Sequence, residues 1–227
     1  MGNQVVKMEV NFDIDNNRFI KIPNNFFYEN SKLYNAIGGK YSFVLYCLIT
    51  IRKNINDDVY LSIAEMNNLI YLDKNESRGR TKVRKSLQLI KDNKLIDFDE
   101  DNLHNDVVKI KWINLFPNRS DGGWIRFEYN DFDVFEIIGV DFYCIMWILR
   151  MYTYYETNTA FLQIKDIARL VGCKTIQVSR AIDLFEYTGL FEVKRGDWEH
   201  IEWAGEWKKK NNSYRYTGNI EYLLGIK

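Results

Sequence analysis

The order of apolar and polar segments occurs twice along the chain. Each copy has an almost wholly apolar stretch, a short strand-like run, two amphipathic segments with helical spacing and then two alternating segments. The matching pieces are Tyr46-Cys47-Leu48-Ile49 with Tyr143-Cys144-Ile145-Met146, Leu61–Met66 with Leu162–Ile167, and Leu69-Ile70 with Leu170-Val171. Two copies are too few for a solenoid, so the pattern predicts a duplicated domain.

In the first copy, 41–52 is apolar nearly all round, as expected of a buried helix. Ser62 and Glu65 have the spacing of a capping box that begins a short second helix. Val83, Leu87 and Ile90 form the buried stripe of a third helix. The elements predicted from Val59 onward are a strand at 59–61, helices from 63 and over 80–93, a strand from 95, an acidic hairpin tip at 99–106 and a strand at 107–113.

The second copy repeats this order. It predicts helices at 142–152, 164–171 and 175–187, strands at 160–162, 191–193 and 198–203, and a tight turn at Arg195-Gly196-Asp197. Helix, strand, helix, helix, strand, strand is the order of a winged helix-turn-helix. We therefore predict an α+β, mainly helical fold of two tandem winged helix-turn-helix domains. The stretch 116–123 gathers Pro, Asn, Ser and Gly, so the domains are predicted at 1–116 and 124–227.

The composition limits the functional classes. The 31 basic and 31 acidic residues cancel, so any DNA contact must come from local basic patches. The three cysteines form no CxxC pair, no signal peptide is recognised at the N-terminus, and the longest apolar run is too short to cross a bilayer. We expect a cytoplasmic protein with no membrane partner. Zinc-ligand and nucleotide-binding motifs are not found, so we expect no cofactor, no metal and no enzymatic activity.

A basic cluster coincides with the predicted third helix of the first copy. In a helix-turn-helix, this helix lies in the major groove and its outward side chains contact DNA. The candidate contacts here are Lys74, Arg78, Arg80, Lys82, Arg84 and Lys85. Arg80, Arg84 and Lys85 are predicted to point away from the apolar stripe. The hairpin after this helix is acidic, so we expect it not to touch DNA.

The corresponding helix of the second copy carries short hydrogen-bonding groups and little charge. Gln can read adenine, Arg can read guanine, and Ser or Thr can bond either a base or a phosphate. The candidate DNA contacts are Lys174, Thr175, Gln177, Ser179 and Arg180, with Lys194 and Arg195 at the predicted wing. The basic segment 208–216, with interleaved tyrosines, is either a backbone-following tail or a solvated extension.

The segment Arg18-Phe19-Ile20-Lys21-Ile22-Pro23-Asn24-Asn25-Phe26-Phe27 precedes the first apolar helix. With the basic stretch 78–85, it resembles the N-terminal winged-helix domain of replication initiators from plasmids and phages of low-GC Gram-positive bacteria. The resemblance covers the first half of the chain. It implies a mobile-element initiator that binds double-stranded DNA at repeated origin sequences, with a second copy or host replication proteins as partners.

Two other functions fit the same pattern. A transcriptional regulator would use identical contact chemistry, and only the location of its DNA site would differ. A protein–protein docking module is favoured by the neutral net charge and the acidic hairpin. An enzyme is the least supported, because the ligand and nucleotide motifs are missing.

Overall fold

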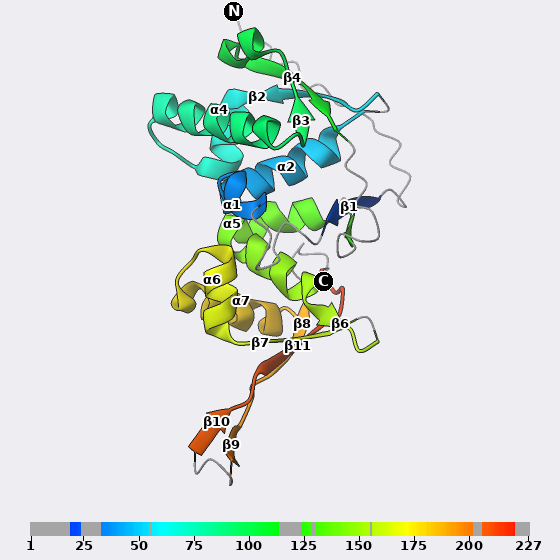
Figure 1. The fold of residues 1–227 in the computed structure, drawn as a ribbon, viewed down its shortest axis with the longest axis vertical. Coiled ribbons are helices and arrows are strands. Elements are labelled where there is room, and N and C mark those ends of the chain that lie inside the picture. Colours follow the sequence, from blue (N-terminus) through cyan, green and yellow to red (C-terminus); the bar gives the residue numbers. More distant parts are fainter. Residues whose placement is uncertain are drawn as a thin grey trace, which may run out of the picture.

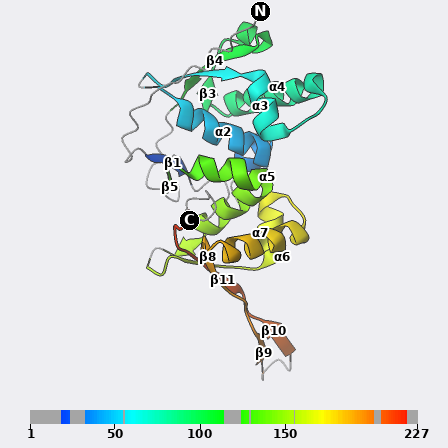
Figure 2. The ribbon, with the colours of Figure 1, turned by 180° about the vertical axis from the view of Figure 1, so that it is seen from behind.

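The computed structural model describes residues 19–23, 33–54, 56–113, 124–128, 130–154, 156–201 and 206–220. Helices and small antiparallel sheets make up an α+β fold, as predicted. We call residues 33–113 the first unit and residues 130–220 the second unit. Figure 1 shows the first unit above the second, and the same stacking is seen from behind in Figure 2.

The first unit contains the predicted elements in the predicted order. They are α2 (Lys40–Arg52), β2 (Asp58–Ser62), α3 (Ile63–Met66) with a π-helical turn (Asn67–Tyr71), α4 (Glu76–Asp92), β3 (Ile96–Asp97) and β4 (Val107–Trp112). Two short helices were not predicted: α1 (Leu33–Ala36) and a 3-10 helix (Glu100–His104) at the acidic hairpin tip. The hydroxyl of Ser62 accepts a hydrogen bond from the backbone N–H of Glu65 at 3.3 Å, which confirms the predicted N-cap. The strand order is β2-β4-β3.

The second unit repeats the arrangement and adds to it. Its elements are α5 (Asn130–Met151), β6 (Thr153–Tyr154), β7 (Thr159–Leu162), α6 (Ile164–Val171), α7 (Thr175–Tyr187), β8 (Phe191–Lys194), β9 (Trp198–Ile201), β10 (Glu206–Lys209) and β11 (Asn212–Tyr216). The strand order is β6-β7-β11-β8. The pairing is the same in both units. In the first unit β4 pairs with β2 and β3, and in the second unit β11 pairs with the corresponding strands, β7 and β8.

Two glycines align the first helices of the units. Gly39 precedes α2 with φ 80°, and Gly139 breaks α5 with φ 74°, a backbone geometry that side chains with a Cβ rarely adopt. Aligning these glycines makes Phe43 equivalent to Tyr143. In this alignment, Tyr46-Cys47 lies three residues, almost one helical turn, beyond the positions equivalent to Tyr143-Cys144.

The two units share one connected core. Helix α2 packs against α5, and the Phe43 and Trp147 rings meet edge to face with centroids 6.3 Å apart. The buried hydroxyl of Tyr34 donates to the Val171 carbonyl at 3.0 Å, which links α1 to the end of α6. A further link comes from two strands outside the units. Strand β1 (Phe19–Pro23) contacts α2, strand β5 (Trp124–Glu128) contacts α5, and the two strands pair antiparallel.

Several predicted boundaries were wrong. Helix α4 begins at Glu76 instead of Arg80, because Asn75 caps it by accepting the Arg78 N–H at 3.0 Å. Helix α5 begins at Asn130, well before the apolar run. The strands β1, β5 and β6 were not predicted: β1 and β5 depend on each other across the chain, and β6 is a two-residue strand beside β7 that has little pattern of its own. The predicted linker, 116–123, lies outside the described residues.

The second hairpin also differs from the prediction. The segment 195–197 is not a tight turn, because the Asp197 carbonyl accepts a hydrogen bond from Lys210 at 2.9 Å and the ribbon continues into β9. Residues of the predicted tail form β10 and β11: β10 pairs with β9 in a two-stranded ribbon, and β11 joins the sheet of the second unit. The β9–β10 ribbon projects away from the second unit (Figure 1). Among the described helices, none combines the length and the apolar character that a membrane crossing requires.

Gly79 allows α4 to approach the π-helical turn closely. A Cβ at this position would lie 1.9 Å from Oδ1 of buried Asn67. Alanine normally improves a helix by about 1 kcal/mol, whereas overpacking a rigid site costs about 1–3 kcal/mol. The contact is with a buried side chain, so we expect the overpacking cost to dominate.

We therefore predict that Gly79→Ala lowers the free energy of unfolding, measured by urea titration. Ser77→Ala, on the exposed side of the same helix, is the matched control and should change stability little. An equal or higher urea midpoint for Gly79→Ala would show that Asn67 moves aside at no cost.

Candidate nucleic-acid interface

Helix α4 has three distinct faces. Its buried face consists of Gly79, Val83, Ser86, Leu87 and Ile90. Opposite this face lies an exposed stripe, which we call the outer face of α4: Ser77, Arg78, Thr81, Lys82 and Lys85. Residues three and four apart share a face of a helix, so this stripe follows directly from the helical period. The outer face is polar and carries no carboxylate.

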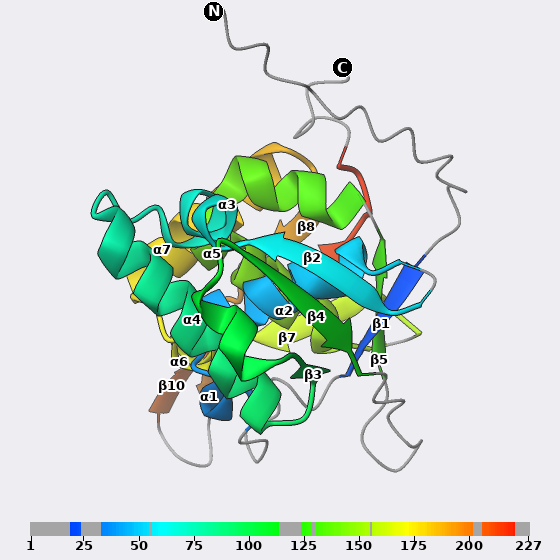
Figure 3. The same ribbon diagram turned by 90° about the horizontal axis from the view of Figure 1, so that it is seen from above.

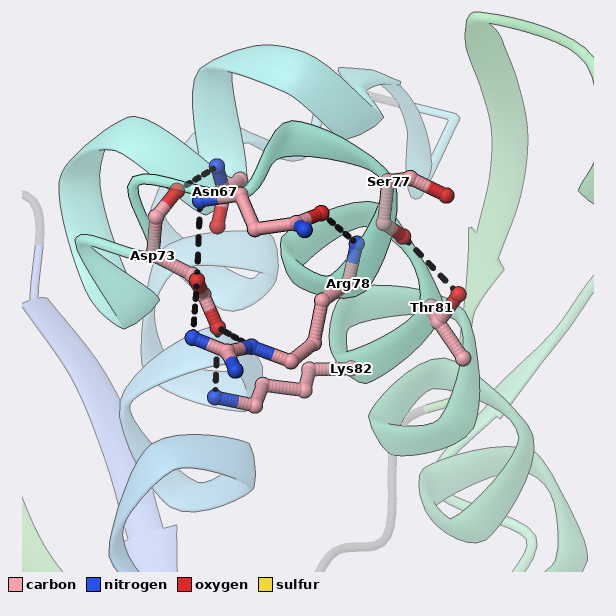
Figure 4. A network of polar contacts seen from close by, with 7 residues as sticks. Asn67, Asp73, Ser77, Arg78, Thr81 and Lys82 are labelled. Atoms are coloured by element: carbon pink, nitrogen blue, oxygen red, sulfur yellow. Dashed lines mark hydrogen bonds and ion pairs between the residues drawn. The ribbon is translucent and has the colours of Figure 1, made fainter.

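A buried carboxylate holds two cations of the outer face (Figure 4). Asp73, in the loop before α4, accepts hydrogen bonds from Arg78 Nε at 2.7 Å and Arg78 Nη2 at 2.9 Å. Lys82 Nζ lies 2.7 Å from the same carboxylate. Hydrogen bonds from Arg78 and Lys82 hold the pKa of Asp73 far below its usual value. The carboxylate is therefore charged over the whole neutral range.

Arg80 and Arg84 stand on a flank of α4 and do not belong to the outer face. Arg80 pairs with Glu76, at 2.7 Å, and with Asp106. Arg84 Nε donates to the Leu103 carbonyl at 2.9 Å. These bonds fasten the acidic hairpin to α4. Both arginines lie outside the buried face of α4, as expected, but they are half-buried and bonded to this hairpin.

Lys74 and Lys85 complete the candidate contacts of the first unit. Both side chains are exposed, and within the described part of the chain neither forms an ion pair. Lys85 lies on the outer face of α4, and Lys74 lies in the loop that leads to it. Lys74 and Lys85 are therefore cations of this region that no carboxylate of the described residues neutralises.

In the second unit, Gln177 is turned toward the first unit. Its Nε2 donates to Asp141, which also forms an ion pair with Lys40 at the start of α2. Its Oε1 accepts the Lys174 backbone N–H at 2.9 Å. Burial lowers the pKa of Lys40, but the hydrogen bond to Asp141 and the negative charge of Asp141 together contribute more, so the net shift is upward. Gln177 thus joins α7 to α2 through one carboxylate.

The other candidates of the second unit lie nearer to solvent. Lys174, Thr175 and Arg180 are exposed at the N-terminal half of α7, and Ser179 is half-buried between them. Lys194 is exposed at the end of β8. Arg195 pairs with Asp183 at 3.0 Å and Glu186 at 2.7 Å. Four candidates therefore share one end of α7, whereas Arg195 is held against its C-terminal half.

Sequence reasoning missed four residues of these arrangements. Ser77 and Thr81 lie on the outer face of α4. Starting the helix at Glu76 rather than Arg80 would have placed Ser77 on this face, and Thr81 lay inside the predicted helix, where the helical period could have found it. Asp73 could have been suspected from the same boundary, because it comes just before the helix. Asp141 could not, because only the fold brings it to Lys40 and Gln177. In comparisons with known proteins, the chain matches no family model, no curated protein and no solved structure.

The low pKa of Asp73 predicts a pH dependence of stability. A carboxyl with a depressed pKa in the folded state stabilises the protein above its unfolded pKa, about 3.9, and loses this contribution as the pH falls toward the folded value. The stability advantage of the wild type over Asp73→Asn should therefore shrink between pH 5 and pH 2. Urea titrations at each pH measure it, and a constant difference would contradict the ion-paired carboxylate.

The link between the units predicts a second effect on stability. Asp141→Ala removes the partner of Lys40 and the acceptor of Gln177, both of which are only partly exposed. We expect a lower thermal midpoint, because a partly buried charge and an amide lose their partner. Asp183→Ala, which removes an exposed partner of Arg195, is the control and should change the midpoint less. Equal midpoints for the two variants would refute the link.

Proposed function

We propose that the chain is a sequence-specific double-stranded DNA-binding protein whose units are winged helix-turn-helix domains. One observation carries the proposal: in each unit an exposed helix, α4 or α7, follows a shorter helix, α3 or α6, and the strand after that exposed helix pairs with the last strand of the unit. Helices α4 and α7 lie toward the same side of the molecule, on the left in both Figure 1 and Figure 3. This placement supports the proposal that one duplex contacts both helices.

The exposed side chains support DNA as the partner. The outer face of α4 offers Ser77, Thr81 and Lys85, and the start of α7 offers Thr175 and Arg180. Hydroxyls and cations of this kind bond phosphates and base edges in the major groove, which admits one α-helix. The chain is neutral overall, so these local groups and not the net charge would attract the duplex.

We infer that the biological role is replication initiation or origin binding for a plasmid or phage. The support is the resemblance of the segment 18–27 and the basic stretch 78–85 to Gram-positive replication initiators. Two units in one chain suit iterated or pseudo-symmetric sites, which single winged helices read by dimerising. A transcriptional regulator would share these contacts, and the genomic position of the bound sequence separates the two roles.

A protein–protein docking module is the second candidate. It is favoured by the internal pairing of the cations, because Arg78, Arg80, Lys82 and Arg195 each contact a carboxylate of the same chain. Such pairing reduces the attraction for a polyanion. Under this alternative, the outer face of α4 would contact a protein and DNA affinity would be weak at any salt concentration.

The proposal predicts that Lys85→Glu and Arg180→Glu each weaken DNA binding. Both residues are exposed, and neither forms an ion pair within the described part of the chain. Replacing a phosphate-contacting cation by an anion adds repulsion, so we expect at least a tenfold loss of affinity at low salt. Selection from random genomic fragments, followed by titration of the enriched sequence, measures the loss.

Lys94→Glu is the matched control, because Lys94 is exposed beyond the C-terminal end of α4. It makes the same change in net charge at the opposite end of the helix and should alter affinity much less. Absence of any enriched sequence, or equal losses in all three variants, would contradict sequence-specific binding through α4 and α7 and favour the docking module.

A further inference from the structure

We propose that Arg78 and Lys82 bind one phosphate group of the DNA backbone and that Asp73 is the residue that positions them. This inference rests on the proposed function and adds a defined contact to it. The three side chains form one cluster at the N-terminal end of α4 (Figure 4). Asp73 lies in the loop before α4, and Arg78 and Lys82 lie in the first two turns of the helix.

The cations cover the carboxylate. The side chain of Asp73 is only 3% exposed, whereas those of Arg78 and Lys82 are 68% and 47% exposed. The two cations therefore lie between the carboxylate and solvent. A ligand that approaches the outer face of α4 meets both cations first and does not contact Asp73.

The hydrogen-bonding capacity left on the cations suits a phosphate. Asp73 occupies the edge of the guanidinium formed by Nε and Nη2. A guanidinium has five N–H donors, so the edge formed by Nη1 and the second hydrogen of Nη2 retains its donors for a bidentate ligand. The Lys82 ammonium has three donors and uses one of them toward Asp73.

The charge of the cluster favours a phosphate over a base. Arg78, Lys82 and Asp73 together carry one positive charge, which one phosphodiester group neutralises. A guanine edge would also accept the Arg78 fork, but it is neutral and would leave that charge unbalanced beside Lys82. We therefore assign the cluster to backbone positioning rather than to base reading.

Asp73 is itself held in place from several sides. Its carbonyl accepts a hydrogen bond from Asn67 Nδ2 at 3.1 Å, and its carboxylate accepts the Asn75 backbone N–H at 3.0 Å. Asn67 is buried against Gly79 of α4. The carboxylate is therefore fixed relative to the helix, so it can hold two long side chains in one arrangement before DNA arrives and reduce the entropy lost on binding.

The salt dependence of DNA binding tests the phosphate site. For Arg78→Gln with Lys82→Gln, we expect the slope of log affinity against log salt to become shallower by about 0.9, the value for one phosphate contact. The loss should be similar for the enriched and random duplexes. Arg52→Gln is the control, because Arg52 also pairs with one carboxylate, Glu65, but lies on α2.

The outcomes separate the two proposals. If the wild type shows no salt-dependent DNA binding, the proposed function fails. If the wild type binds DNA and the double variant keeps its slope, DNA binding stands and the phosphate site is refuted. A loss confined to the enriched sequence would assign Arg78 to base reading and also refute the phosphate site.

Asp73→Asn tests the positioning role. It removes a negative charge, so affinity for random duplex should stay the same or rise, while the preference for the enriched sequence should fall severalfold. Asp101→Asn makes the same charge change on the exposed acidic hairpin and should leave the preference unchanged. Asp73→Glu retains the charge and should restore part of the preference. Equal preferences in Asp73→Asn and Asp101→Asn would show that Asp73 positions nothing.

Discussion

The packing of α2 against α5 determines where everything else in the molecule lies. These helices are the most apolar of their units, and together they form the centre of one connected core. Helix α4 packs on α2, and helix α7 packs on α5. The contact between α2 and α5 therefore also sets the separation of α4 and α7. The link from Lys40 through Asp141 to Gln177 ties the start of α7 to the start of α2. Helices α4 and α7 are therefore held at one fixed spacing.

Charge is balanced locally as well as overall. Asp73 takes up two cations on the outer face of α4, and Arg80 and Arg84 are directed to the acidic hairpin. The result is a surface whose free cations are few and specifically placed, which suits selective recognition better than general attraction to a polyanion. The hairpins of the two units differ accordingly: the first is short, acidic and fastened to α4, whereas the second extends into the projecting β9–β10 ribbon.

Most of the helical elements could be predicted from the chain because their apolar spacing is long and regular. Helices α2, α6 and α7 begin within two residues of their predicted positions. Failures occurred where local signals are weak. The break at Gly139 concealed the first half of α5, and β1 and β5 exist only through pairing with each other across the chain. Strand β6 has only two residues, too few for an alternating pattern. The hairpin that follows α7 was predicted to have a tight turn because Arg195-Gly196-Asp197 has turn composition.

The sequence by itself determined the order of elements, the buried faces of the helices and the concentration of cations around α4, because these depend on residue type and helical period. The tertiary structure alone decided which cations remain open to a ligand. Asp106 reaches Arg80 through the hairpin, and Asp141 reaches Gln177 and Lys40 through the contact between the units. Ion pairs form between groups that the fold brings within a few ångströms, and neither composition nor periodicity specifies those distances.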